Sequence, residues 1–339
     1  MYSRIEGDIL YMKILFIIDR LELKWFEFND LVTNFWLIRE FIYNGHDVFI
    51  TTIDLLSLQN KKPWADCFRT EIKDDNLIYD KTSSQKYCIN DFNLVMFRPD
   101  PPVDMDYINA TYIFDFVDYE KTLVLNNPCA IRDFNEKLHA VEFLDLMPEN
   151  IVTASKKDIL NFLEEHERIV LKPLNQCFGS GVMVLQKGDM NTSVIINQMT
   201  KNSSTLVMVQ KYIEKAKFGD KRVMFLGDRV LEVCVQKLPG QNDFKFNDHC
   251  DKNIVKAVLM PTEVQKFTPV AKKLNSMGLE LVGLDVIDEK IIEINVTSPC
   301  YFIREVNNHF GVHLEKEVAG YILKRAEGKI LSPMINTQI

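Results

Sequence analysis

The chain has 339 residues, of which 47% are hydrophobic and 26% are charged, and its formal net charge is −8. This composition is typical of folded globular domains and excludes a disordered chain, and the length suffices for two or three compact domains. The acidic total argues against general binding to nucleic acid, which requires an excess of positive charge.

Neither the cysteines nor the apolar runs indicate an exported or membrane-bound protein. The seven cysteines are odd in number and contain no CxxC pair, so we expect neither a disulfide framework nor zinc, and a reducing cytoplasm fits best. No apolar run approaches the roughly 20 residues that cross a bilayer. Residues 1–11 lack the apolar core of a signal peptide and either are native or precede a natural start at Met12.

The first part of the chain predicts alternating strands and helices. A buried strand over 14–18 precedes a helix that begins near Asp30 and ends before Gly45, and the next strand spans 48–53. This order predicts a parallel sheet, while the GxGxxG fingerprint of a dinucleotide fold is absent. Further strands are predicted over 93–97 and 122–125.

From about residue 128 the pattern predicts helices followed by hairpins. One helix is expected over 132–146, and a second begins with the capping pair Ser155 and Asp158 and ends near His166. The polar stretch 240–253 has no periodicity and predicts a long loop, which is typical of an active-site lid. Strands are predicted over 168–172, 182–185, 205–210, 221–225 and 229–236, and helices over 261–277 and from about 312.

The stretch GLDVIDEKIIEINVTSP (283–299) places two carboxylates and an amide among apolar residues. If 288–290 form a three-residue turn, Asp285 lies opposite Glu293, and Asn295 shares their face because strand side chains alternate. Facing carboxylates repel each other unless a cation lies between them, and Mg²⁺ prefers oxygen ligands. The hairpin therefore indicates either a divalent-metal site or an exposed polar hairpin.

A lysine and a glycine-containing loop form a second polar feature. Lys172 ends the apolar strand IVLKP and leads into PLNQCFGSG, where Gly179, Ser180 and Gly181 would let backbone N–H groups approach phosphate oxygens. The loop is not a P-loop, because GxxxxGK[ST] is missing. A solvated strand end explains Lys172 equally well, and Lys137, expected on the 132–146 helix, carries no signal by itself.

Two more strand ends carry polar side chains. Gln210 ends a strand and is followed by KYI, which is compatible with a nucleotide hinge or with an ordinary strand end. Asp220 and Arg222 in GDKR are compatible with a phosphate clamp or with surface charge on a turn.

Together and in this order, these stretches resemble the bacterial glutathione synthetase family of the ATP-grasp superfamily. The resemblance extends over nearly the whole chain from Met12, and its most specific parts are NEKL, KPL and GLDVI…EINVTSP. It is carried by FRPDPPVDMDYINATY (97–112), NNPCAIRDFNEKL (126–138), IVLKPL (169–174), QKYI (210–213), GDKRV (219–223), GLDVIDEKIIEINVTSP (283–299) and IRE (303–305).

The resemblance implies an α/β chain with the ATP-grasp fold. A Rossmann-like N-terminal domain would span 1–128, and two α+β lobes enclosing ATP would span 129–212 and 213–339, the last with the metal site and the lid loop 240–253. The implied activity is that of an ATP-dependent carboxylate–amine ligase that forms glutathione from γ-glutamylcysteine and glycine through an acyl phosphate. The implied cofactors are ATP and Mg²⁺, with Mn²⁺ as an alternative. The implied partners are small-molecule substrates and further copies of the chain, without nucleic acid or membrane.

The resemblance also assigns roles to single residues. Arg222 would lie near the transferred phosphoryl group, and we expect Arg304 to bind a substrate carboxylate, although a structural ion pair would explain it equally well. The catalytic residues would be Lys172 and Arg222; the nucleotide-binding residues Lys137, Lys172, Gly179, Ser180, Gly181, Gln210, Lys211, Tyr212, Ile213, Asp220 and Asn295; the metal ligands Asp285, Glu293 and Asn295; and the substrate-binding residues Asp30, Arg222, Asn247 and Arg304.

The chain departs from the family pattern at the parts that close over substrates. The family loop DGMGG reads NQCFG here, which keeps only Gly179, and the lid segment GNLAAGGRG reads FNDHCDKN, which keeps Asn247. The family's DSS-like motif reads NDLV, which keeps Asp30, and one residue is inserted after TSP. Two alternatives follow: a diverged ligase that joins another acid and amine, or a non-catalytic nucleotide-binding protein. The retained metal ligands and lysines argue against the second.

Overall fold

The computed structural model describes residues 10–24, 32–177, 179–240, 253–299 and 302–336. The chain forms two compact units. Unit 1 comprises 1–100, 105–129 and 300–339, and unit 2 comprises 101–104 and 130–299. The predicted domain ranges 1–128, 129–212 and 213–339 stay a prediction. Within the described residues, no helix has the length and apolar character needed to cross a membrane.

Unit 1 is built on a sheet whose first strands run parallel, as predicted. Strand β1 pairs with β2 and β7, and β7 pairs with β8, all in parallel. Helix α2 connects β1 to β2 and buries Phe35, Ile38 and Phe41. It ends before Gly45, whose φ of +83° suits a glycine after a helix end. The bounds are β1 Lys13–Ile17, α1 Arg20–Lys24, α2 Thr33–Tyr43, β2 Asp47–Thr51, β7 Leu94–Phe97, α3 Met105–Ile113, β8 Leu123–Leu125, α8 Ile303–Phe310 and α9 Leu314–Asn336.

Antiparallel hairpins, which the sequence did not predict, extend this sheet. The long strand β4 pairs with β2, β3, β5 and β6. The turns at 60–61 and 74–75 have positive φ at both central residues, a hairpin geometry that glycine or Asn-Gly usually signals. Here Asn-Lys and Asp-Asp occupy these positions, so the usual turn signal is missing. The bounds are β3 Leu56–Gln59, β4 Lys62–Lys73, β5 Asn76–Tyr79 and β6 Gln85–Cys88.

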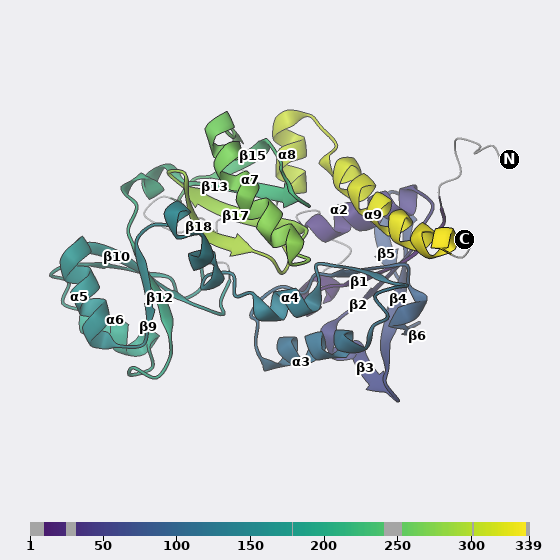
Figure 1. Cartoon of the computed structure of the whole chain (residues 1–339), viewed down its shortest axis with the longest axis horizontal. Coiled ribbons are helices and arrows are strands. Elements are labelled where there is room, and N and C mark those ends of the chain that lie inside the picture. The colour runs from purple at the N-terminus through teal and green to yellow at the C-terminus, as the bar shows by residue number, and fades with distance from the viewer. Residues whose placement is uncertain (1–9, 25–31, 178, 241–252, 300–301, 337–339) are drawn as a thin grey trace. The chain divides into compact units, whose positions relative to one another are not determined.

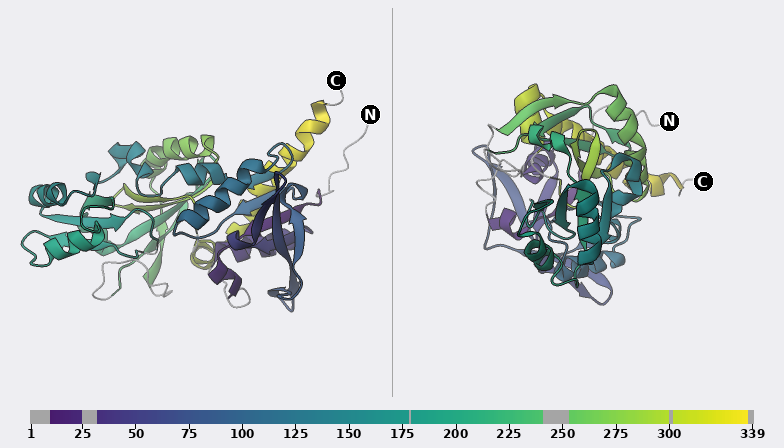
Figure 2. Two further views of the ribbon diagram at one scale, coloured as in Figure 1. Left: turned by 90° about the horizontal axis from the view of Figure 1, so that it is seen from below. Right: turned by 90° about the vertical axis from the view of Figure 1, so that its left-hand side faces the viewer.

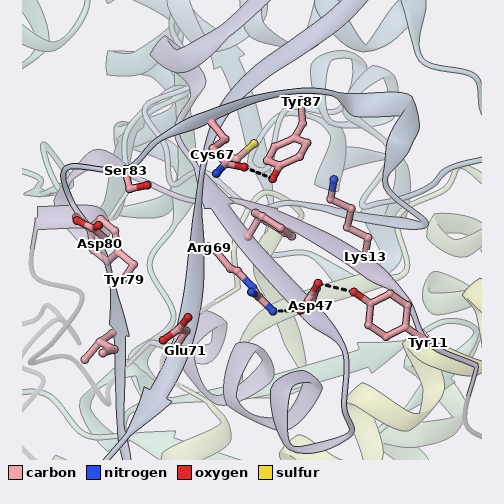
Figure 3. Close-up of a pocket in the computed structure, with 13 residues that line it drawn as sticks. Tyr11, Lys13, Asp47, Cys67, Arg69, Glu71, Tyr79, Asp80, Ser83 and Tyr87 are labelled. Atoms are coloured by element: carbon pink, nitrogen blue, oxygen red, sulfur yellow. Dashed lines mark hydrogen bonds and ion pairs between the residues drawn. The ribbon is translucent and has the colours of Figure 1, made fainter.

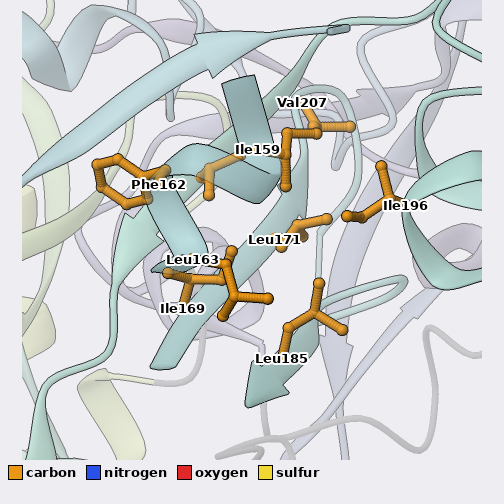
Figure 4. Close-up of a cluster of buried hydrophobic side chains, with 9 residues drawn as sticks. Ile159, Phe162, Leu163, Ile169, Leu171, Leu185, Ile196 and Val207 are labelled. Atoms are coloured by element: carbon orange, nitrogen blue, oxygen red, sulfur yellow. The ribbon is translucent and has the colours of Figure 1, made fainter. Parts of the chain in front are cut away.

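The first half of unit 2 is a four-stranded antiparallel sheet covered on one face by α5 and α6 (Figure 1). Alternate residues of its strands pack under these helices, including Ile169, Leu171 and Val209 (Figure 4). Ser155 accepts a hydrogen bond from the Asp158 N–H and caps α5, as predicted. The bounds are β9 Asn150–Thr153, α5 Lys156–His166, β10 Arg168–Pro173, β11 Met183–Gln186, α6 Thr192–Met199 and β12 Val207–Lys211.

The second half of unit 2 is a six-stranded antiparallel sheet with α7 along one face (Figures 1 and 2). Lys221 on this sheet reaches Glu263 of α7 at 2.8 Å. Because neighbouring side chains on a strand point to opposite faces, Arg222 and its cross-strand partner Asp285 lie on the face away from α7. The bounds are β13 Asp220–Leu226, β14 Arg229–Val230, β15 Val233–Lys237, β16 Ile254–Val258, α7 Pro261–Ser276, β17 Leu281–Ile287 and β18 Lys290–Asn295.

The predicted helix over 132–146 is wrong in its middle. The structure has α4 (Pro128–Asp133), a turn over 136–138 that carries Lys137, and a 3₁₀ helix η5 (His139–Leu146). The Asn135 side-chain oxygen accepts hydrogen bonds from the N–H groups of Lys137 and Leu138. An asparagine that binds nearby backbone in this way competes with helix formation.

The predicted turn of the 283–299 hairpin is one residue too long. Ile287 pairs with Lys290, so the turn contains only Asp288 and Glu289, both with positive φ. A bulge then shifts the register after Val286, and the predicted pairing of Asp285 with Glu293 is restored.

Candidate functional site

The three predicted metal ligands lie together on β17 and β18. Asp285 is directly opposite Glu293, and the Asn295 amide donates to Asp285 Oδ2 at 3.4 Å and to the Gly283 carbonyl at 3.3 Å. Two carboxylate groups and one amide oxygen are therefore contributed by one hairpin face. Such hard oxygen donors are the ligands that Mg²⁺ prefers.

Two cations hold the Asp285 carboxylate. Arg222 Nε donates to Oδ1 at 2.6 Å and its Nη2 donates to Oδ2 at 3.1 Å, and Lys237 Nζ lies 3.7 Å from Oδ1. Burial alone would raise the pKa of Asp285, but the charges of Arg222 and Lys237 lower this pKa to about 2. The carboxylate is therefore ionised at neutral pH, as metal binding requires.

Lys237 also holds Asp220, which lies across from it on β13. Its Nζ is 3.0 Å from Asp220 Oδ2, while Asp220 Oδ1 is buried without a hydrogen-bond partner among the described residues. Burial raises the pKa of Asp220 to about 6, and Lys237 opposes this rise. The sequence did not predict the contact with Lys237. Leu231 and Glu232 interrupt the strand between β14 and β15, so the pairing with β13 changes register there and brings Lys237 opposite Asp220.

Lys137 and Lys172 both contact β18. Lys137 Nζ donates to Glu293 Oε1 at 2.7 Å and to the Gln176 carbonyl at 2.6 Å, and Lys172 Nζ donates to the Ile292 carbonyl at 3.1 Å. Burial would lower the pKa of Lys137, but Glu293 raises it above its ordinary value. Burial lowers the pKa of Lys172 to about 8, with Glu293 opposing and Lys137 reinforcing the shift.

A buried carboxylate fixes the turn that carries Lys137 onto this strand. Glu136 Oε1 accepts hydrogen bonds from the N–H of Val296, the N–H of Thr297 and the Thr297 hydroxyl, at 2.8–3.0 Å. The Glu136 carbonyl accepts from the Ile294 N–H at 3.0 Å. Burial raises the pKa of Glu136. This contact explains physically why NEKL and EINVTSP belong to one site, and residue spacing alone could not have revealed it.

The glycine-containing loop begins and ends near these lysines. Gly179 and Gly181 have φ of +62° and +71°, and a Cβ on Gly181 would lie 2.8 Å from Pro173 Cγ. Gly181 is therefore required both by its backbone conformation and by the space beside Pro173. The Ser180 N–H donates to the Cys177 carbonyl at 2.9 Å, which closes the loop.

The predicted hinge begins with Gln210 on β12. Lys172 pairs with Met208 and Val170 pairs with Gln210, so Lys172 and Gln210 share the sheet face opposite the α5–α6 core. Gln210 is 2% exposed, and its Nε2 has no hydrogen-bond partner among the described residues. A buried amide donor of this kind suits a heteroaromatic acceptor such as a nucleotide base.

The other hinge residues are arranged around β12. Lys211 Nζ is 2.8 Å from the exposed Glu149 carboxylate, and the Tyr212 ring lies 3.7 Å from the Arg168 guanidinium carbon. Ile213 follows and precedes a 3₁₀ turn.

Comparison with known proteins decides the family. A model of the N-terminal domain of prokaryotic glutathione synthetase matches residues 12–132, and a model of its ATP-grasp domain matches residues 136–311. A glutathione synthetase of Nostoc sp. is 36% identical over 293 residues, 84% of this chain and 90% of the relative. One from Vibrio parahaemolyticus is 32% identical over 298 residues, 88% of this chain and 94% of the relative.

The chain belongs to the prokaryotic glutathione synthetase family. It is an ATP-dependent C–N ligase, as members of this family are, and it depends on a divalent metal. Its substrates are small molecules or peptides, as those of this family are.

Solved structures confirm the ATP-grasp fold predicted from the family resemblance. A D-cycloserine synthetase superimposes with a TM-score of 0.64 at 14% identity, covering 93% of this chain and 99% of that one. A RiPP-associated ATP-grasp ligase of Chryseobacterium gregarium, in complex with ADP and a leader and core peptide, gives a TM-score of 0.61 at 15% identity, covering 93% of this chain and 97% of that one.

Of the four residues expected to bind substrate, Arg222 belongs to this geometry through its pair with Asp285. Asp30 and Asn247 lie outside the described residues, as does most of the lid loop 240–253. Arg304 belongs to α8 of unit 1, where its Nη2 is 3.2 Å from Glu305 Oε1. Their roles in this family member stay predictions.

Proposed function

We propose that the protein joins γ-glutamylcysteine to glycine, with ATP converted to ADP and phosphate, and so forms glutathione. The main observation in support is a contact between distant parts of the sequence. Asp285 and Glu293 face each other on β17 and β18, and Lys137 and Lys172 both contact β18. Relatives that bear the name glutathione synthetase match this chain over most of its length.

A carboxylate must be activated before an amine can attack it. In the proposed reaction an oxygen of the peptide carboxylate bonds to the γ-phosphorus of ATP, the bond to the β,γ-bridging oxygen breaks, and ADP leaves. The glycine nitrogen then attacks the carbonyl carbon, loses a proton, and phosphate departs. Such a transfer depends on alignment and charge stabilisation and needs no protein nucleophile.

The charges of the site suit a triphosphate accompanied by a divalent ion. Four cations, Lys137, Lys172, Arg222 and Lys237, meet three carboxylates, Asp220, Asp285 and Glu293. Lys172 has a hydrogen bond only to a carbonyl among the described residues, so its charge is not neutralised by direct pairing. We assign Lys172 and Arg222 to stabilise the negative charge of the transferred phosphoryl group.

Asp285, Glu293 and Asn295 would hold Mg²⁺, with Mn²⁺ as the alternative, because their oxygens are hard donors and Asp285 is ionised. When bound, the ion would supply positive charge that neutralises negative charge on the phosphates. Turnover measured with each metal separately distinguishes the two ions.

The nucleotide would lie on the face shared by Lys172 and Gln210. Gln210, Lys211, Tyr212 and Ile213 would contact the base, the loop 179–181 would offer the N–H groups of Gly179 and Gly181 to phosphate, and Asp220 would complete the nucleotide site. Support comes from Gln210 Nε2 and Asp220 Oδ1, two of the three buried side-chain polar atoms without a hydrogen-bond partner in the described part of unit 2, the third being Ser298 Oγ.

We further propose that Arg222, Arg304, Asp30 and Asn247 bind substrate and that the protein is a cytoplasmic homo-oligomer. The family resemblance supports both statements. Light scattering of the purified protein tests the second, and a monomer at micromolar concentration would contradict it.

The substrate assignment is tested by ADP release over a matrix of acids and amines. We expect turnover of γ-glutamylcysteine with glycine to exceed every other pair by at least about tenfold in kcat/KM. Glu293→Gln, purified in parallel, measures contaminating activity. Faster turnover with another acid or amine would show a diverged ligase, for which the altered loop NQCFG is the motivating feature.

A further inference from the structure

A cavity of about 800 Å³ lies on one face of the unit 1 sheet, and no residue proposed for ATP, metal or substrate lines it. Alternate residues of β4, Cys67, Arg69 and Glu71, share this face with Lys13 of β1 and Phe49 of β2. The volume is in the range of sites for small ligands. The proposed ligase reaction therefore does not explain what this cavity binds.

One end of the cavity is cationic. Lys13 Nζ lies 3.5 Å from the ring centroid of Tyr87 (Figure 3). It lies 4.8 Å from the ring centroid of Phe92 and 5.1 Å from that of Phe49. The charges of Asp47 and Asp91 act on this ammonium group, yet within the described residues no carboxylate forms an ion pair with it. Aromatic faces attract the cation but leave its N–H donors without a strong acceptor.

The floor beside Lys13 is not reactive. Cys67 is buried, and burial raises the pKa of its thiol to about 12. A thiol with such a pKa is protonated and serves as a small apolar group, so no covalent or redox step is expected here.

The other end of the cavity is acidic and open. Glu71 and Asp80 are exposed, and Figure 3 shows them on the opposite side of the cavity from Lys13. Among the described residues, Glu71 makes no ion pair, and the side chain of Asp80 accepts hydrogen bonds only from Thr82. Both carboxylates are thus available to an ammonium group.

Between the two ends of the cavity, the charged side chains are paired with each other. Arg69 Nη2 lies 2.5 Å from Asp47 Oδ1, and the Tyr11 hydroxyl donates to the other Asp47 oxygen (Figure 3). Because Arg69 and Asp47 neutralise each other, the polarity of the cavity is set by Lys13 at one end and by Glu71 and Asp80 at the other.

We propose that this cavity binds a zwitterion of amino-acid or short-peptide chemistry, with its carboxylate at Lys13 and its ammonium group at Glu71 and Asp80. A purely anionic ligand would meet the acidic end, and a purely cationic ligand would meet Lys13. A ligand with both charges, separated by a body that lies along Phe49 and Tyr87, satisfies both ends.

The test is calorimetric titration of the full chain with di- and tripeptides that carry free termini, glutathione among them, up to about 5 mM, where weak sites saturate. We expect at least one peptide to bind with one-to-one stoichiometry. N-acetylation or C-amidation of that peptide should each weaken its binding by at least about tenfold, because each removes one charge.

Matched variants locate the site. Lys13→Met and Glu71→Gln should each weaken binding at least about tenfold, whereas Lys86→Met and Asp66→Asn, on the opposite strand faces, should not. Glu71 is exposed, so Glu71→Gln remains informative even if Lys13→Met fails to fold. No saturable binding by any peptide, or binding unchanged in Glu71→Gln, would overturn the proposal. Turnover of ATP with γ-glutamylcysteine and glycine, which takes place at the ligase site, should be unchanged in Glu71→Gln.

Discussion

The proposed ligase site in unit 2 and the Lys13 cavity in unit 1 both gather charged side chains on sheet faces, but they bury those charges to different degrees. The side chains of Asp220, Asp285 and Lys137 are 2%, 10% and 5% exposed. In the cavity wall, Arg69 is 59% exposed and Asp47 is 29% exposed.

This difference determines what each charge contributes. A buried charge has lost its hydration, so removing its partner is strongly destabilising, and its position is fixed by the pairs that it makes. An exposed pair is screened by water and contributes little to stability. The ligase site is thus pre-organised for an ionic ligand, whereas the cavity wall can change without large cost.

The largest effect is expected at the centre of the buried network. Asp285→Asn removes the charge that holds Arg222 and Lys237 and leaves only a neutral amide oxygen for the metal, so we expect kcat to fall about a thousandfold or more. ADP release with saturating ATP measures it, and circular dichroism checks folding. Asp288→Asn, in the exposed turn of the same hairpin, is the control. Near wild-type turnover of Asp285→Asn would refute the metal assignment.

A smaller effect is expected at Lys237, which contacts the site through two carboxylates. Lys237→Met leaves Asp220 and Asp285 without their shared cation, so the pKa of Asp220 should rise further and nucleotide binding should weaken. We expect kcat/KM for ATP to fall by about ten- to a hundredfold. Lys237→Arg keeps the charge and should recover most of the loss. Equal losses in both variants would mean that side-chain shape, not charge, matters here.

The sequence predicted the parallel strands, the Ser155 cap and the Asp285–Glu293 pairing, because these follow from local periodicity and hydrogen-bonding chemistry. It did not predict β3 to β6, whose turns lack glycine, or the interrupted helix around Asn135. These features depend on turn conformations that several residue types adopt, so composition alone does not signal them.

The site shows the same division. Motifs in the sequence predicted the individual site residues Lys137, Lys172, Asp285 and Glu293. They did not predict the residues that contact them in the folded chain. Lys237 meets Asp220 only because the β14–β15 interruption shifts the register, and Glu136 reaches Thr297 over a long sequence separation. Such contacts are products of tertiary packing.

The third prediction uses the pKa of Lys172 and tests whether burial controls its charge. Burial lowers this pKa to about 8, so the protonated amine that would bind phosphate is lost as pH rises through that value. We expect kcat/KM for ATP to be about tenfold lower at pH ~9 than at pH ~7. In Lys172→Arg, the guanidinium stays charged and the decline should disappear. A flat profile in the wild-type protein would show that the amine is not needed as a cation.

The smallest effect is expected in the exposed cavity wall. Arg69→Met removes the ion pair with Asp47, but Asp47 keeps the Tyr11 hydroxyl and contact with water. We expect the midpoint of thermal unfolding to change by less than about 3 °C and kcat to change less than about twofold.

A double-mutant cycle of Arg69→Met with Asp47→Asn isolates the pair itself. Because both side chains are partly hydrated, their coupling should be below about 1 kcal/mol, the usual upper value for exposed pairs. A coupling of several kcal/mol would mean that the cavity wall behaves like the buried network around Asp285. Burial would then not explain the difference between the two regions. The order of the four expected effects would have to be explained by the geometry of the contacts alone.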